Sequence, residues 1–119
     1  MIGELKGSFR LSQLSVEANV PSGARGVYLL SRGERSERNR LIVSFVGRSR
    51  DVRESLLSRL QGETQYLYFW YCTAESDNEA FEQECKDFHS YSSVKVLDCS
   101  HPKPPEGSSL NCPVCHVAH

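Results

Sequence analysis

The run Tyr66 to Thr73 constrains the fold most, because it holds five aromatic side chains within eight consecutive residues. Aromatic residues favour strands, and a strand with apolar side chains on both sides must be covered on both faces. A helix on each side of a small sheet provides that cover in a chain of this size. Aromatic residues also stack on the bases of single-stranded nucleic acids, but packing in a core is the favoured interpretation here.

Two further strands are expected at residues 26–30 and 41–46, which are short apolar runs rich in β-forming residues. The polar residues 31–40 separate them, so the pattern predicts a hairpin with a long charged loop. Gly47 is expected to end the second strand. Upstream, the apolar residues between Phe9 and Val16 indicate a short helix or a lead-in segment.

Two helices are expected, at residues 51–60 and 76–91. Ser49 or Asp51 caps the first, whose apolar side chains recur at helical spacing. Ser76 and Glu79 have the spacing of a capping box at the start of the second. The fold class is therefore mixed α+β, an α/β protein in the broad sense, with a small three-stranded, mainly antiparallel sheet flanked by helices.

The size and composition indicate a single domain, since 119 residues with 39% hydrophobic content leave no room for a second core of ordinary size. No run approaches the roughly 18 apolar residues of a membrane span, and the first nine residues lack the layout of a secretory signal. Five cysteines, an odd number, favour a reducing compartment. We expect a soluble, cytoplasmic protein that does not bind membranes.

The charges are unevenly distributed along the chain. Residues 25–59 hold nine arginines and four acidic residues, a balance of +5, whereas residues 60–119 hold nine acidic residues and three lysines, a balance of −6. A basic half is compatible with a face that binds phosphates. A solvated charged hairpin is an equally strong interpretation.

Glu84 is the most informative single residue. It lies three residues after Phe81 and four before Phe88, and so falls on the apolar side of the second expected helix. A carboxylate in that position is costly unless it is paired or bound to a cation. A salt bridge to an arginine and an edge position facing solvent are the structural alternatives.

The order of these elements resembles the GIY-YIG nuclease superfamily. The matching residues are Gly26-Val27-Tyr28 on the first strand, Phe45-Val46-Gly47 on the second, the run Arg48 to Arg53, and Glu79 to Glu84 at the start of the second helix. Each tripeptide alone is a weak signal, but their order is more specific. The resemblance covers about residues 24–91, which places a GIY-YIG-like domain at residues 1–91 and a tail of the same domain at residues 92–119.

The resemblance implies metal-dependent hydrolysis of phosphodiesters in DNA. Glu84 would hold a catalytic Mg²⁺ or Mn²⁺, Tyr28 would help to activate the attacking water, and Arg48 would lie beside that tyrosine. Together with Arg59, these are the candidate catalytic residues. The candidate DNA-binding residues are Arg48, Arg50, Arg53 and Arg59.

The chain also departs from the family pattern. Phe45 stands where the second motif has a tyrosine, and Ser55 matches the family's arginine on the first helix. Arg59 lies one turn after Ser55 and is a candidate substitute. Two hypotheses therefore remain: a DNA endonuclease with weak activity, and a non-catalytic nucleic-acid or protein interaction module on the same scaffold. A zinc-dependent assembly factor is a more distant third.

The tail holds a second set of candidate metal ligands. Cys112 and Cys115 have the spacing with which a cysteine pair grips one zinc ion. The other two ligands are expected to be one of His116 or His119 and one of Cys99 or His101. Zinc would order a proline-rich tail of low apolar content. Free thiols in a disordered tail, or a redox pair, are the alternatives.

Overall fold

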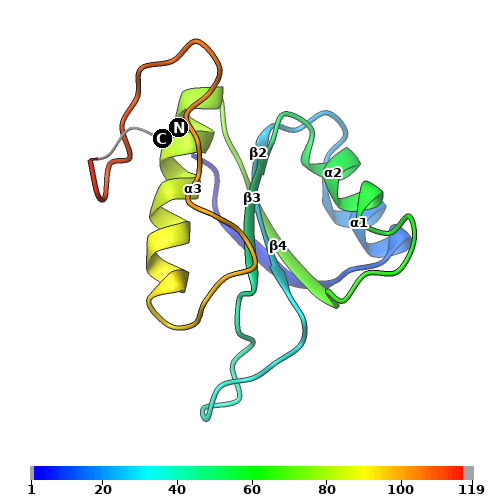
Figure 1. Ribbon diagram of the computed structural model, residues 1–119. Coiled ribbons are helices and arrows are strands. Elements are labelled where there is room, and N and C mark those ends of the chain that lie inside the picture. The colour runs from blue at the N-terminus through cyan, green and yellow to red at the C-terminus, as the bar shows by residue number, and fades with distance from the viewer. Residues whose placement is uncertain (1, 117–119) are drawn as a thin grey trace.

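The computed structural model describes residues 2–116 and shows one four-stranded antiparallel sheet with three helices (Figure 1). The strand order in the sheet is β1-β4-β2-β3. The elements in chain order are β1 (Lys6–Arg10), α1 (Gln13–Asn19), β2 (Gly26–Ser31), β3 (Phe45–Ser49), α2 (Val52–Ser58), β4 (Tyr68–Thr73) and α3 (Asp77–Ser92). The mixed α+β class is confirmed, with four strands rather than three.

The sheet has a hydrophobic core on each face. Side chains of α1 and α2 pack with Leu30, Phe69 and Tyr71 on one face. Residues of α3 pack with Val27 and Leu29 on the other. Figure 1 shows α3 alone on one side of the sheet and α1 with α2 on the opposite side. The aromatic strand β4 is therefore covered on both faces, as its composition predicts.

Side-chain caps start the helices at the expected places. The Asp51 carboxylate accepts a hydrogen bond from the Glu54 N–H and begins α2. The Ser76 hydroxyl accepts one from the Glu79 N–H and begins α3. Each cap satisfies a backbone donor that has no partner within the helix, which fixes the residue at which the helix starts.

The expectations for two strands need correction. β1 escapes detection because it is polar and mostly exposed, and its pairing with β4 shifts register between Gly7 and Phe9. β3 starts four residues later than expected and continues through Gly47 to Ser49. Gly47 stays in the ladder opposite Tyr28, so this glycine does not end the strand.

The C-terminal tail returns over α3. It leaves the end of α3, runs between this helix and β3, and then folds back along the outer side of the helix (Figure 1). Cys112 is fully buried there and forms a small apolar cluster with Phe81 and Cys85 of α3. The tail thus belongs to the same compact unit. In the described part of the chain, no helix has the length and apolarity to cross a membrane.

Candidate functional site

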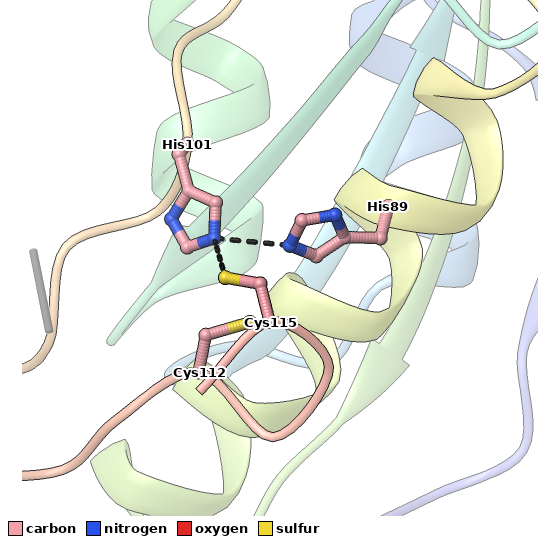
Figure 2. A group of neighbouring side chains, drawn as sticks. All are labelled: His89, His101, Cys112 and Cys115. Atoms are coloured by element: carbon pink, nitrogen blue, oxygen red, sulfur yellow. Dashed lines mark hydrogen bonds between the residues drawn. The ribbon is translucent and has the colours of Figure 1, made fainter. Parts of the chain in front are cut away.

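Four side chains from α3 and the tail form a candidate metal centre: His89, His101, Cys112 and Cys115 (Figure 2). Their ligand atoms all lie within 4.8 Å of one another. The Nε2 atom of His101 lies 3.1 Å from Nε2 of His89 and 3.5 Å from Sγ of Cys115. Ligands of a tetrahedral zinc ion are about 3.5 Å apart, so this group of residues could hold a metal ion.

His101 is held in the orientation that metal binding needs. Its Nδ1 atom lies 2.8 Å from the carbonyl oxygen of Pro102. A carbonyl can only accept, so Nδ1 carries a proton. The lone pair of Nε2 then faces the cluster whenever that nitrogen is unprotonated. Histidines that bind metals typically donate the other ring N–H to a carbonyl or carboxylate in this way. Phe88 packs against the rings of both histidines.

The Cys112 thiol is prepared for ionisation. Burial opposes ionisation, but the backbone N–H groups of Cys115 and Val114, together with the His101 and Cys115 side chains, lower the pKa of Cys112 to about 5. Deeper in the same cluster, burial raises the pKa of Cys85 well above its ordinary value. Cys112 is therefore suited to act as a thiolate ligand, whereas Cys85 is a packed thiol.

The ligand set differs in part from the expected one. Of the alternatives, His101 joins the cysteine pair and Cys99 does not. His116 lies outside the cluster and instead donates its backbone N–H to the Cys112 carbonyl, with a positive φ of 59°. His119 lies outside the described residues. The fourth member is His89, which was not among the ligands expected from the sequence. It follows Cys85 by one helical turn, and this spacing is the only signal for it in the sequence.

A cleft at the β3 edge of the sheet brings together Tyr28, Arg48 and Glu84. Tyr28 comes from β2, Arg48 from β3 and Glu84 from α3. The Arg48 guanidinium donates a hydrogen bond to the Glu84 carboxylate, with Nη1 3.0 Å from Oε1. Phe45, Cys99, His101 and Lys103 are among the other lining residues.

The absence of a side chain at Gly47 allows Tyr28 to reach this cleft. A Cβ atom at position 47 would lie 2.5 Å from Cζ and 2.7 Å from Oη of Tyr28. The phenol therefore passes directly over the Gly47 backbone. It also stacks on Phe45, with ring centroids 6.1 Å apart.

Glu84 is a largely buried carboxyl group, with 12% of its side chain exposed. Burial raises the pKa of Glu84 to about 7, although the charges of Arg48 and His101 act to lower it. One ion pair thus offsets only part of the desolvation cost. A second cation near this carboxylate would be stabilising.

Arg59 and Ser55 do not line this cleft. The Arg59 guanidinium packs 4.3 Å from the ring centroid of Phe45 and 5.9 Å from that of Tyr66. It lines a neighbouring pocket with Glu63 and Tyr66. The Ser55 hydroxyl donates to the Ser49 hydroxyl at 2.6 Å, so its side chain makes a local contact.

The two other candidate DNA-binding arginines have different environments. Arg50 is paired with Asp77 at 2.9 Å, and 78% of its side chain is exposed. Arg53 donates to the backbone carbonyls of Val20 and Glu17, at 2.8 and 2.6 Å. Arg50 is therefore accessible to a ligand, whereas Arg53 joins α2 to the end of α1.

Comparison with known proteins identifies no relative: no family model matches the chain, and neither a curated protein nor a solved structure does.

Proposed function

We propose that the cleft formed by Tyr28, Arg48 and Glu84 hydrolyses phosphodiesters of DNA in a metal-dependent reaction. The observation that carries this proposal is that Tyr28 and Glu84, which are far apart in the sequence, line the same cleft beside a cation. A phenol, a guanidinium and a carboxylate together match the groups that phosphoryl transfer uses. The resemblance to the GIY-YIG superfamily assigns the same three residues.

Glu84 fits the role of a metal ligand. Its carboxyl group is buried, and its raised pKa indicates that Arg48 does not fully compensate its charge. Mg²⁺ and Mn²⁺ often bind through one carboxylate, with water and substrate phosphate completing the shell. When bound at Glu84, such a cation would neutralise negative charge on the phosphate under attack.

Side chains of the protein would orient the attacking water and bind the phosphate. In the reaction, a water oxygen bonds to phosphorus while the bond from phosphorus to the leaving ester oxygen breaks. Tyr28 Oη orients this water, whose proton passes to solvent, and the leaving oxygen takes up a proton from solvent. Arg48 binds a non-bridging phosphate oxygen once it exchanges Glu84 for the substrate.

Two features limit the expected rate. Phe45 supplies no hydroxyl, and Ser55 supplies no cation to the cleft. Loss of one positioned cation at a phosphoryl transition state costs about 10³-fold or more in rate. The proposed activity is therefore slow nicking of DNA.

The second candidate is a non-catalytic interaction module that binds nucleic acid or protein. The Arg48–Glu84 ion pair favours it, because two of the groups that catalysis needs are occupied with each other. The contact of Ser55 with Ser49 favours it as well.

We further propose that the cluster of His89, His101, Cys112 and Cys115 binds zinc as a structural ion. Two thiols and two imidazoles are a common tetrahedral ligand set for Zn²⁺. Zinc would join the tail to α3, and its thiolate ligands suit the reducing cytoplasm, where we expect the protein to act.

Cleavage of supercoiled plasmid and branched DNA by excess protein over hours, with Mg²⁺ or Mn²⁺, tests the enzymatic proposal. The expected result is weak nicking that Glu84→Ala abolishes and Ser55→Arg increases. Glu82→Ala, an exposed substitution two residues away on α3, is the matched control and should cleave like wild type. Activity that survives Glu84→Ala would contradict the assigned site. No cleavage even by Ser55→Arg would favour the interaction module.

A further inference from the structure

The tail segment of residues 99–103, here called the strap, forms one wall of the cleft. It contributes Cys99, Ser100, His101, Pro102 and Lys103 to the lining, together with Tyr28 and Glu84 from the sheet and α3. In Figure 1 this part of the tail runs between α3 and β3. The position of the strap therefore determines which groups a molecule in the cleft meets.

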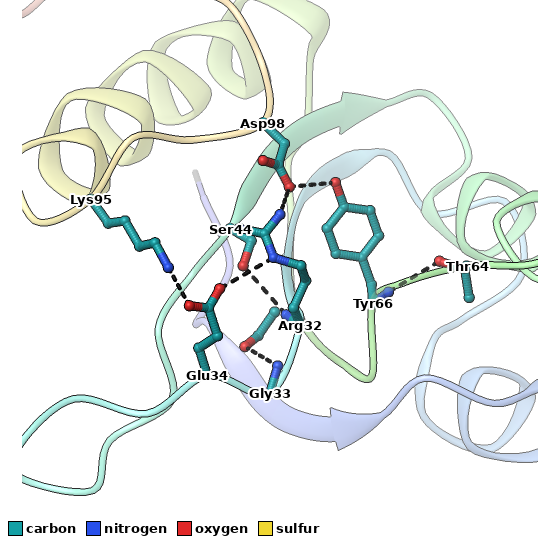
Figure 3. A network of polar contacts seen from close by, with 9 residues as sticks. Arg32, Gly33, Glu34, Ser44, Thr64, Tyr66, Lys95 and Asp98 are labelled. Atoms are coloured by element: carbon teal, nitrogen blue, oxygen red, sulfur yellow. Dashed lines mark hydrogen bonds and ion pairs between the residues drawn. The ribbon is translucent and has the colours of Figure 1, made fainter.

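A polar network fixes the start of the strap. The backbone N–H of Asp98 donates to the Ser44 carbonyl at 2.8 Å. The Asp98 carboxylate pairs with Arg32 and accepts a hydrogen bond from Tyr66 Oη at 3.0 Å (Figure 3). A neighbouring ion pair joins Glu34 to Lys95. These contacts tie the strap to the hairpin loop and to the segment before β4.

The candidate metal centre lies at the other end of the strap. His101 is the member of the cluster that belongs to the strap, and it points toward His89 of α3 and Cys115 of the tail (Figure 2). The Pro102 backbone carbonyl accepts from His101, and Pro102 itself is buried. A metal ion on His101 would join the strap to α3 at one position, two residues before Lys103.

Lys103 brings a second cationic side chain to the cleft. The first is Arg48, which is already paired with Glu84. Position 55 holds a serine and brings no positive charge. Lys103 is exposed and lines the cleft with Arg48 and Glu84. An ammonium group that lines the same cleft as Arg48 adds a positive charge, which suits a negatively charged phosphate.

We propose that Lys103 binds a backbone phosphate of DNA in the cleft, and that a metal ion in the His89–His101–Cys112–Cys115 cluster positions it by holding the strap. This inference rests on the proposed function, since it takes DNA as the ligand of the cleft. In this role Lys103, which belongs to the tail, replaces part of the positive charge that an arginine at position 55 of α2 would bring.

Titration of a labelled DNA duplex at several salt concentrations, without divalent cations other than bound zinc, tests the phosphate contact. Lys103→Ala should weaken binding and reduce the slope of log K against log[salt] by about 1, the value for one lost phosphate contact. Lys86→Ala is the matched control, because Lys86 is an exposed lysine on α3 outside the cleft lining. It should leave the slope unchanged.

The role of the metal is tested by combining substitutions. His89→Ala removes a ligand on α3 without changing the strap, so Lys103→Ala should have little further effect on DNA affinity in that background. A measurement without DNA runs in parallel: the amide hydrogens of Ser100, His101 and Lys103 should exchange faster after zinc removal from the wild type. Residues of β2 serve as the internal reference for an intact fold.

The outcomes separate this inference from the proposed function. If wild type binds DNA and Lys103→Ala binds equally well with the same salt slope, the inference is overturned and the proposed function stands. If exchange in the strap is the same with and without zinc, the positioning role of the metal is overturned. If wild type binds no DNA at low salt, both are overturned.

Discussion

At the residue scale, Glu84 shows how burial and pairing compete at one carboxyl group. Its neighbours Arg48 and His101 favour the charged form, but burial outweighs them and the pKa rises to about 7. The carboxyl group is therefore partly protonated near neutral pH. It also makes the stability of the protein depend on pH.

Replacement of Glu84 by glutamine should stabilise the protein at high pH. The pKa is higher in the folded state than its ordinary value, so the unfolded chain releases this proton first as pH rises, and stability falls between about pH 4.5 and 7. Glu84→Gln removes this loss of stability, because the glutamine side chain has no proton to release in this pH range. Denaturant unfolding without added Mg²⁺ should show the variant about 1–3 kcal/mol more stable at pH 8, with a smaller difference at pH 5.

Glu82→Gln, exposed on the same helix, is the control and should follow wild type at both pH values. A Glu84→Gln variant that is less stable than wild type at pH 8 would show that the Arg48 ion pair outweighs burial.

Gly47→Ala should be destabilising through Tyr28. The new Cβ would lie 2.5 Å from Cζ of Tyr28, so the phenol must move. Overpacking of this kind costs about 1–3 kcal/mol. A double-mutant cycle measured by denaturant unfolding checks the cause: the cost of Gly47→Ala should fall when Tyr28 is already valine. An unchanged cost would assign the strain to the backbone or to Phe45 instead.

At the element scale, α3 serves both sites from one face. Phe81 and Cys85 pack with Cys112 of the tail, Glu84 lines the cleft, and His89 belongs to the candidate metal cluster. Residues three or four apart share a face of a helix, which is why one element can carry all of them. The strap also contributes to both sites, because it lines the cleft and carries His101 of the cluster.

The protein purified without added metal should contain about one equivalent of zinc, measured by elemental analysis under reducing conditions. Cys112→Ser and His89→Ala should each lower the zinc content, and zinc removal should lower the unfolding temperature, because bound metal stabilises the folded state. His116→Asn should keep the zinc, since His116 lies outside the cluster and asparagine tolerates a positive φ. Less than a tenth of an equivalent in wild type would refute the zinc site.

At the scale of the whole molecule, folding pairs the basic half of the chain with the acidic half. Arg25 and Arg50 both contact Asp77, Arg48 pairs with Glu84, and Arg32 pairs with Asp98. The exposed arginines of the hairpin loop are Arg35, Arg38 and Arg40. The charge asymmetry of the sequence thus becomes a set of ion pairs, which reduces the positive surface left for phosphates.

DNA binding is expected to be weak and to decrease with salt, since only part of the arginine set is accessible. Arg50→Gln should lower DNA affinity without changing the unfolding temperature, because its guanidinium is exposed and its ion pair is a surface one. Arg53→Gln should instead lower the unfolding temperature, since it loses hydrogen bonds to α1 carbonyls. Fluorescence titration and thermal unfolding of both variants separate the two roles. Equal effects on affinity would contradict this division.

The sequence by itself determined the features that depend on neighbouring residues. The cap at Ser76, the aromatic strand and the apolar stripe of α3 follow from local hydrogen bonding and from side-chain periodicity. For the cap of α2 the sequence left Ser49 and Asp51 as alternatives, and the structure shows Asp51. The spacing of Cys112 and Cys115 also indicates a metal-binding pair. These are short-range properties, so they can be read along the chain.

Only the tertiary structure decided which distant groups meet. Strand β1 has no apolar alternation and exists through its hydrogen bonds to β4. His89 became the fourth member of the metal cluster, and Arg48 rather than another arginine became the partner of Glu84. These choices depend on how the tail returns over α3 and how β3 lies against that helix. Contacts between residues far apart in the chain are set by packing of whole elements, for which local pattern carries no signal.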